Sequence, residues 1–192
     1  MKSNPDAPVR FTYLNTHLDD QSDDQRRLAA SLMLARARYE AYKTGGPVIV
    51  TGDFNSPATG RDSGAYQIIT GQIPPVAINA TFAERFAVPD GTLSDFKLLD
   101  LKAETPREFV SGEFATYTGW NAPGDASVYT RIDFVYGGSN GKWWVLLSSS
   151  ELDPPLMSYF RTSNAYRVGT SLTDDGVLAS DHRPVFADIT FN

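Results

Sequence analysis

The chain has 192 residues, of which 41% are hydrophobic and 12% aromatic, and this is enough apolar material for one domain with a sizeable core. Its formal net charge of −6 and pI near 4.8 argue against tight non-specific binding to nucleic acid, which relies on many Lys and Arg contacts to phosphates. The absence of cysteine excludes disulfides, thiolate metal sites and cysteine nucleophiles. No apolar run reaches membrane-spanning length and no signal peptide is visible, and the compartment stays unknown.

The first part of the chain predicts a strand, a helix and a second strand. Residues 9–16 alternate as a strand does, and a capping box that starts at Ser22 predicts a helix start. Helical spacing predicts a core-facing stripe of Leu28, Leu32, Ala35, Tyr39 and Tyr42. Arg26 lies off that stripe, residues 45–47 end the helix, and residues 48–50 predict a buried strand. This order indicates a βαβ-like crossover.

The remainder of the chain predicts several more strands and long loops. A short helix is expected over residues 63–70, and residues 71–92 are expected to be rich in loops. Strands are expected over residues 96–101, 114–118, 132–136, 143–147 and 184–191. Residues 148–179 are expected to be irregular, and loops of that length are usually functional or disordered. The fold class is therefore α/β with many strands.

The segment VTGDFNSP, residues 50–57, ends the second strand abruptly. Gly52 breaks the strand, and Asp53 and Asn55 follow two residues apart, so their side chains would project together. A carboxylate can accept a proton or bind a metal, and a carboxamide both donates and accepts hydrogen bonds. An Asx turn accounts for the same residues, and it is the better interpretation of this segment taken alone.

Polar side chains also recur at the ends of other predicted strands. His17 ends the first strand, and His182, the second of only two histidines, precedes the last strand. The other members of this set are Asp53, Asn55, Asp133 and Asp181. Strand ends along one edge of a sheet converge, and active sites of α/β proteins collect there. A lone His–Asp pair is usually structural, whereas clusters at several strand ends favour a functional site.

The motifs NTHLD, GDFN, YTGW, RID and SDHRPV resemble, in this order, those of the endonuclease/exonuclease/phosphatase superfamily. SGAY after GDFN and Arg27 in the first helix fit the same pattern. The resemblance covers nearly all of residues 9–191, and the ordered set is far more specific than a single motif such as RID. It implies part of a two-sheet α/β sandwich over residues 9–192, which lacks the N-terminal strands and follows a polar leader over residues 1–8. It also implies divalent-metal-dependent hydrolysis of a phosphoester, as a phosphodiesterase, nuclease or phosphatase.

The resemblance assigns roles to the residues at the centre of this chemistry. Asp53 would be the general base that takes a proton from water, and Asn55 would orient that water and bind a phosphoryl oxygen. His182 would stabilise charge on the phosphate. Asp133 would hold the other ring nitrogen of His182 and fix its tautomer. An ordinary acid at a strand end is the alternative for Asp133.

Further residues would bind the substrate and the metal. His17 would contact the phosphate from the other side, although a partly buried histidine bonded to backbone is its alternative interpretation. Asn15 is a further candidate for substrate binding. Asp181 would help to hold Mg²⁺ or Mn²⁺. The aromatic and basic residues Trp143, Trp144, Tyr159, Phe160 and Arg161 either line a substrate surface or pack in the core and loops.

The family's first half, with the glutamate that is its principal metal ligand, has no recognisable equivalent in this chain. Without that half, a face of the sheet would be open and the metal would lack a ligand. We therefore expect a homodimer or a companion chain to cover the face, because soluble monomers avoid large apolar patches. The expected substrate is a small-molecule or lipid phosphoester, or weakly bound nucleic acid. The alternative is an altered or inactive descendant that acts as a binding protein or performs non-hydrolytic acid/base chemistry.

Overall fold

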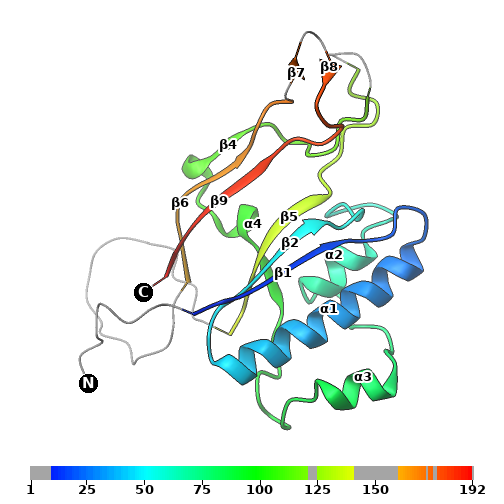
Figure 1. The fold of residues 1–192 in the computed structure, drawn as a ribbon, viewed down its shortest axis with the longest axis vertical. Helices are drawn as coiled ribbons and strands as arrows, with labels where there is room; N and C mark the ends of the chain where they lie inside the picture. The colour runs from blue at the N-terminus through cyan, green and yellow to red at the C-terminus, as the bar shows by residue number, and fades with distance from the viewer. Residues whose placement is uncertain (1–9, 121–124, 141–159, 172, 175–176, 192) are drawn as a thin grey trace.

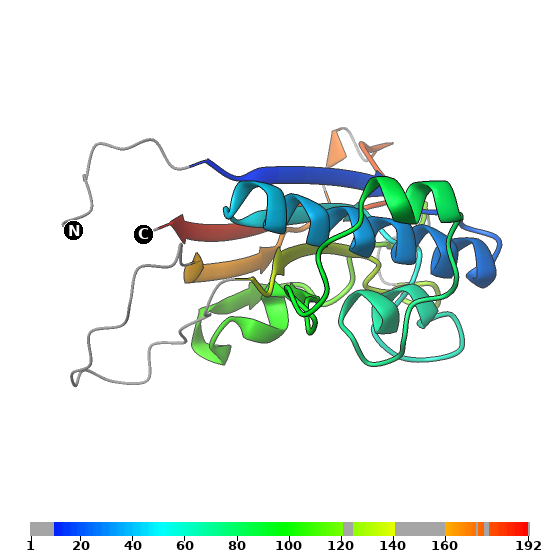
Figure 2. The same cartoon turned by 90° about the horizontal axis from the view of Figure 1, so that it is seen from below.

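The computed structural model describes residues 10–120, 125–140, 160–171, 173–174 and 177–191. They form three layers, in which a four-stranded sheet lies between a layer of helices and a three-stranded sheet (Figure 1). The helix layer contains α1 (Asp23–Thr44), α2 (Gly64–Ile69) and α3 (Ala80–Arg85). Figure 2 shows the same layers from below, with α1 running along the sheet. The two-sheet α/β architecture confirms the predicted fold class.

The four-stranded sheet has the order β1-β2-β5-β3. Its strands are β1 (Thr12–His17), β2 (Val48–Asp53), β5 (Asp133–Gly138) and β3 (Leu98–Asp100). β1 runs parallel to β2, while β5 is antiparallel to both of its neighbours. The register places His17 opposite Asp53, and Asp53 opposite Asp133. Because partners in adjacent strands point to the same face, these side chains share one row across the end of the sheet.

Helix α1 begins and ends as the sequence predicts, but it buries a different face. The Ser22 side chain accepts a hydrogen bond from the amide of Gln25, and Gly45 caps the other end in the left-handed region, with φ 63°. The buried positions are Arg26, Ala30, Ser31, Leu34, Ala37 and Ala41. The predicted stripe was wrong, because small alanines let the helix approach the sheet closely. Leu28 and Tyr42 are 37% and 43% exposed.

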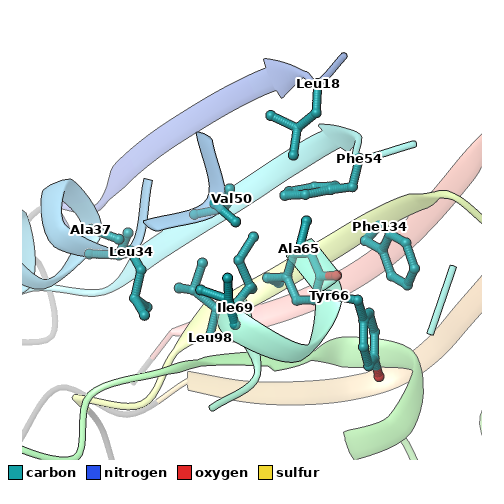
Figure 3. Packing of buried hydrophobic residues seen from close by; sticks show 14 of the residues in the cluster. Leu18, Leu34, Ala37, Val50, Phe54, Ala65, Tyr66, Ile69, Leu98 and Phe134 are labelled. Atoms are coloured by element: carbon teal, nitrogen blue, oxygen red, sulfur yellow. The ribbon is translucent and has the colours of Figure 1, made fainter. Parts of the chain in front are cut away.

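The main core lies between the helices and the four-stranded sheet (Figure 3). The Phe54 ring packs edge-on against Phe134 and Tyr136, with centroids 5.9 and 5.0 Å apart. Tyr66 of α2 packs against the same two rings of β5. Aromatic pairs of this geometry are stabilising beyond the area they bury. The aromatic cluster therefore anchors the segment that leaves β2 directly beside the end of the sheet.

The second sheet is larger than the sequence indicated. Its order is β4-β6-β9, formed by Val110–Gly112, Phe160–Val168 and Val185–Phe191. The last strand is as predicted, but β6 lies in the stretch that was expected to be irregular, which also holds the short pair β7 (Thr173–Asp174) and β8 (Val177–Leu178). In the sequence FRTSNAYRV of β6, apolar and polar residues alternate clearly only at the end, where buried Tyr166 and Val168 flank exposed Arg167, and the register shifts between Thr162 and Tyr166. Its pairing with β9, distant in sequence, decides its structure.

Other differences from the predicted elements are local. Residues 114–118 form no strand, and Tyr117 makes only isolated bridges to Thr130 and His182. The loop-rich region contains α3, and a short helix α4 (Leu101–Glu104) and a 3₁₀ turn (Arg107–Phe109) follow β3. The expected strand 143–147 lies outside the described residues, as do Trp143, Trp144 and Tyr159 and the side chains of Phe160 and Arg161.

The sheet face that was expected to be open is covered in part. A second apolar cluster of Ile49, Leu101, Val135, Tyr166 and Val168 joins the two sheets, so β5 and part of β2 are protected. Within the described residues, the face remains open beside β1, where Tyr13 and the preceding Phe11 are 56% and 51% exposed. Among the described helices, none is both long and apolar enough to span a membrane.

Candidate active site

Gly52 allows β1 and β2 to bring His17 and Asp53 together. Its φ of 145° lies in a region that side chains disfavour, and a Cβ at this position would collide with the carbonyl oxygen of Thr16 in β1. Thr16 is the residue paired with Gly52 in the sheet. The glycine of GDFN is therefore required by the close approach of two backbones, and this approach positions the next residue, Asp53.

The two carboxylate oxygens of Asp53 have different partners. Oδ1 accepts a hydrogen bond from the backbone amide of Asn55 at 2.8 Å, which is the Asx turn anticipated from the sequence. Oδ2 lies 3.3 Å from Nε2 of His17 and 3.7 Å from Nε2 of His182. The turn and the functional interpretation are thus compatible, because the turn uses one oxygen and leaves the other facing two imidazoles.

Burial raises the pKa of the Asp53 carboxyl, and the negative charge of Asp133 raises it further. The Asn55 amide and the two histidines act in the opposite direction but do not cancel this effect. A carboxylate with a raised pKa is a stronger base, so it accepts a proton more readily than an exposed aspartate does.

The predicted hydrogen bond between His182 and Asp133 is present. Nδ1 of the imidazole lies 2.8 Å from Oδ2 of Asp133. The amides of Ile132 and Asp133 both donate to Oγ1 of Thr116, each at 3.0 Å, and this holds the carboxylate in place. The ring of Tyr117 packs edge-on against the imidazole, with centroids 5.1 Å apart. The histidine precedes a strand of the second sheet, so the pair is built across both sheets.

Asn55 is held beside Asp53 in a conformation that few residues adopt. Its φ is 45°, in the left-handed region that asparagine tolerates better than most side chains. Its side-chain Nδ2 donates to the carbonyl oxygen of Leu18 at 2.9 Å. This bond fixes the carboxamide at the wall of the site, next to the end of β1.

These residues open into a cavity of about 1260 Å³. The predicted site residues that line it are His17, Asp53, Asn55, Asp181 and His182. Asp133 lies behind His182 and lines an adjoining hollow of about 400 Å³, which His17 and Asp53 share. Asn15 lines that hollow and not the main cavity, and its Oδ1 accepts from Oγ1 of Thr51 at 2.9 Å.

Several lining residues were given no role from the sequence, although Asp19 and Tyr117 belong to the motifs NTHLD and YTGW; the others are Asp20, Arg26 and Asp62. Arg26 is only 3% exposed and donates to Asp62 at 3.1 Å and to the carbonyl oxygen of Asp19 at 3.2 Å. The sequence held one signal for the placement of Arg26, because it follows Asp23 by three residues on the helix. The two side chains form an ion pair, with 3.7 Å between Nη2 and Oδ1. Asp62 lies in a loop and could not be placed from the sequence.

The donors at this site suit a divalent cation. Within the described residues, Asp53, Asp133 and His182 each offer one ligand atom, and these atoms lie within 4.8 Å of one another. Asp181 adds a further carboxylate to the same cavity. Oxygen ligands of this kind are those that Mg²⁺ and Mn²⁺ prefer.

The chain belongs to the endonuclease/exonuclease/phosphatase family, whose sequence profile matches residues 4–182. A search of curated protein sequences finds no match. Among solved structures, the endonuclease/exonuclease/phosphatase from Bacteroides vulgatus is similar, with 22% identity and a TM-score of 0.54 over 92% of this chain and 48% of that one. A mannosyl-6-phosphatase from Bacteroides thetaiotaomicron has 19% identity and a TM-score of 0.52 over 95% and 52% of the two chains.

A functionally unknown conserved protein from Enterococcus faecalis is also similar, with 17% identity and a TM-score of 0.50 over 93% of this chain and 50% of that one. At these identities the three structures establish a shared fold. The chain spans about half of the length of each of them.

Proposed function

We propose that the chain carries the general base and the phosphate-binding histidines of a divalent-metal-dependent phosphoesterase. The observation that supports this most directly is the row of His17, Asp53 and Asp133 at the end of the sheet, with His182 bonded to Asp133. The row places a carboxylate of raised pKa between two imidazoles at the wall of one cavity. Membership of the family supports the same chemistry.

In this mechanism Asp53 removes a proton from the attacking water, using the oxygen that the Asx turn leaves unused. The Asn55 carboxamide orients that water and binds a phosphoryl oxygen. Asp133 accepts from Nδ1 of His182, and this directs Nε2 toward the substrate. His182 and His17 then stabilise the charge that develops on the phosphoryl oxygens.

Asp181 would help to hold the divalent cation in the cavity, and the glutamate of the family's first half would be the principal ligand. When bound, the cation would supply positive charge to the phosphoryl group. The negative residues that line the cavity make such a charge necessary, because a phosphate would otherwise be repelled. The cation is proposed to be Mg²⁺ or Mn²⁺.

The substrate is proposed to be a small-molecule or lipid phosphoester. Asp19, Asp20 and Asp62 line the cavity beside the reacting groups, and the only lining arginine among the described residues, Arg26, is paired with Asp62. This acidic surface disfavours the repeated phosphates of nucleic acid, whose binding relies on cationic side chains. The named phosphatase among the similar structures is compatible with such a substrate.

A companion segment is proposed to complete the fold and the metal site. The relatives of known structure are about twice as long as the matched region, and the open part of the sheet lies at β1. The segment would cover that face and contribute the glutamate ligand, either from a second chain or from a longer form of this one.

The test measures phosphate release from a panel of phosphoesters, with and without Mg²⁺ or Mn²⁺. The chain is assayed alone and mixed with the half of the Bacteroides vulgatus relative that it does not span. We expect metal-dependent release when that half is present, and Asp53→Asn should reduce the rate by at least about a hundredfold, because a general base is lost. The matched control is Asp90→Asn, at an exposed loop position outside the cavity, which should leave the rate unchanged.

If the completed protein binds phosphoesters but releases no phosphate with either metal, the hydrolase proposal is wrong. The non-hydrolytic descendant, a binding protein with the same pocket, would then be the better account.

A further inference from the structure

Arg131 and Asp100 form an ion pair in the interior of the protein, where they are 7% and 5% exposed. Nη1 of the guanidinium donates to Oδ2 of Asp100 at 2.7 Å, and Nη2 donates to Oδ1 at 2.6 Å. The hydroxyl of Tyr66 donates to Oδ2 at 3.2 Å, and Nη2 of Arg131 also donates to the hydroxyl of Tyr166 at 3.1 Å. We call these residues the Arg131 network. None of these four side chains lines the cavity, although Tyr166 is close enough to Asp133 for the carboxylate charge to act on its hydroxyl.

The network joins all three layers of the fold. Tyr66 belongs to α2, Asp100 ends β3 of the first sheet, and Tyr166 lies in β6 of the second sheet. Arg131 precedes β5 by two residues. Its guanidinium also lies 4.3 Å from the centroid of the Phe134 ring. The position of Arg131 is therefore determined from several directions.

A buried ion pair of this kind is weak evidence for stability as such. Removing two charges from water is costly, and apolar residues of similar volume often give equal or greater stability. What the pair does provide is direction, because a two-pronged guanidinium–carboxylate contact allows only one relative orientation of the groups.

Short stretches of hydrogen-bonded backbone connect the Arg131 network to both Asp133 and His182. Asp133 follows Arg131 by two residues, and the carbonyl oxygen of the intervening Ile132 accepts from the amide of Phe54 at 2.8 Å. On the other side, Tyr166 pairs in register with Ala187 of β9. The amide of Gly169 donates to the carbonyl oxygen of Pro184 at 2.8 Å, so the pairing continues to within two residues of His182.

We propose that Arg131 is a positioning residue: through Asp100 and Tyr166 it sets the distance between the two sheets at the point where Asp133 meets His182. The His–Asp hydrogen bond spans the two sheets, so it has the correct length only when the sheets are held in one relative position. The proposal concerns that hydrogen bond, and only its importance for catalysis rests on the proposed function.

The experiment follows the Nδ1 proton of His182 by ¹⁵N-edited NMR in the 192-residue chain. Its chemical shift and its exchange with solvent report the hydrogen bond to Asp133 directly, whether or not the protein hydrolyses a substrate. Tyr166→Phe removes one hydroxyl and keeps the ring, and Arg131→Lys keeps the charge but loses the two-pronged contact. We expect an upfield shift and about tenfold faster exchange in each variant, as loss of one hydrogen bond would produce.

The matched control is Tyr136→Phe. The Tyr136 hydroxyl is fully buried in the same region and has no hydrogen-bond partner among the described residues, so its removal changes the core without cutting the network. Amide exchange in α1 serves as a measure of general loosening. Unchanged Nδ1 exchange in Tyr166→Phe, or equal acceleration in Tyr136→Phe, would overturn the proposal and leave the network with a structural role only. Because Tyr166→Phe retains the ring, it decides the question even if Arg131→Lys fails to fold.

Discussion

Single residues at the end of β2 serve both the backbone and the chemistry. Gly52 is needed for the approach of β1, Asp53 closes a turn with one oxygen, and Asn55 takes a left-handed conformation while its side chain binds Leu18. Such local constraints come from the motif itself. The ordered motifs predicted that Asp53, Asn55, Asp133 and His182 lie close together, as they do in the structure, and their catalytic roles are proposed. Arg26 could not be found this way, because its place at the cavity depends on Asp62, which is distant in sequence.

At this scale we predict the effect of Gly52→Ala. The added methyl group meets the Thr16 carbonyl, and the backbone is held in a region that alanine disfavours, so unfolding should become easier by about 1–3 kcal/mol or more. Chemical denaturation measures the change. Gly91→Ala is the matched control, since Gly91 also has a positive φ, 75°, but nothing lies within 4 Å of its added Cβ. Equal losses in the two variants would show that the close approach of β1 is not what requires Gly52.

Helices and strands were predicted correctly where the local sequence determines them, and less well where packing or pairing with another element determines them. The cap at Ser22, the buried β2 and the final strand followed from local patterns. The buried face of α1 did not, because large residues such as Tyr39 contact Phe86 outside the main core while alanines face the sheet. Strand β6 was missed because its first half is polar, and the alternation of Tyr166, Arg167 and Val168 is too short to indicate a strand without its partners β4 and β9.

The contact between α2, β5 and β6 gives a prediction at alkaline pH. Burial, and then the negative charge and hydrogen bond of Asp100, raise the pKa of Tyr66 to about 12. Burial likewise raises the pKa of Tyr136 and of Tyr166. A phenol whose pKa is raised by folding stabilises the protein fully below its ordinary pKa of about 10, and this contribution is lost as the pH rises toward 12.

Absorbance of phenolate and circular dichroism, recorded during the same titration, measure this effect. Three tyrosines should remain un-ionised above pH 10 and should ionise only as the protein unfolds. Tyr66→Phe should reduce the number of these late-ionising tyrosines by one. Complete ionisation of all tyrosines while the circular dichroism stays native would contradict the expected burial.

For the whole molecule, the sequence predicted a two-sheet sandwich but underestimated how much of the second sheet the chain contains. The motifs are concentrated on the first sheet and at the start of β9, and they carry no information on β4 or β6. In the strand orders β1-β2-β5-β3 and β4-β6-β9, β1 is an edge strand of the first sheet and β9 is an edge strand of the second. Tyr13 of β1 and Phe11, just before it, are exposed next to the hollow that Tyr13, Asn15 and Val185 line.

The exposed residues at the β1 edge of the first sheet should make the isolated chain associate. Exposed aromatic residues beside unpaired strand edges favour association with another strand, so the isolated chain should self-associate at micromolar concentrations. Light scattering of the chain should show species larger than a monomer, and Phe11→Ser with Tyr13→Ser should shift them toward the monomer. Phe114→Ser is the matched control, because Phe114 is 70% exposed but lies away from β1. The half of a relative that this chain does not span should compete with self-association and yield a one-to-one complex. A stable monomer that does not bind this half would mean that the face needs no cover, and the companion segment would then have to be abandoned.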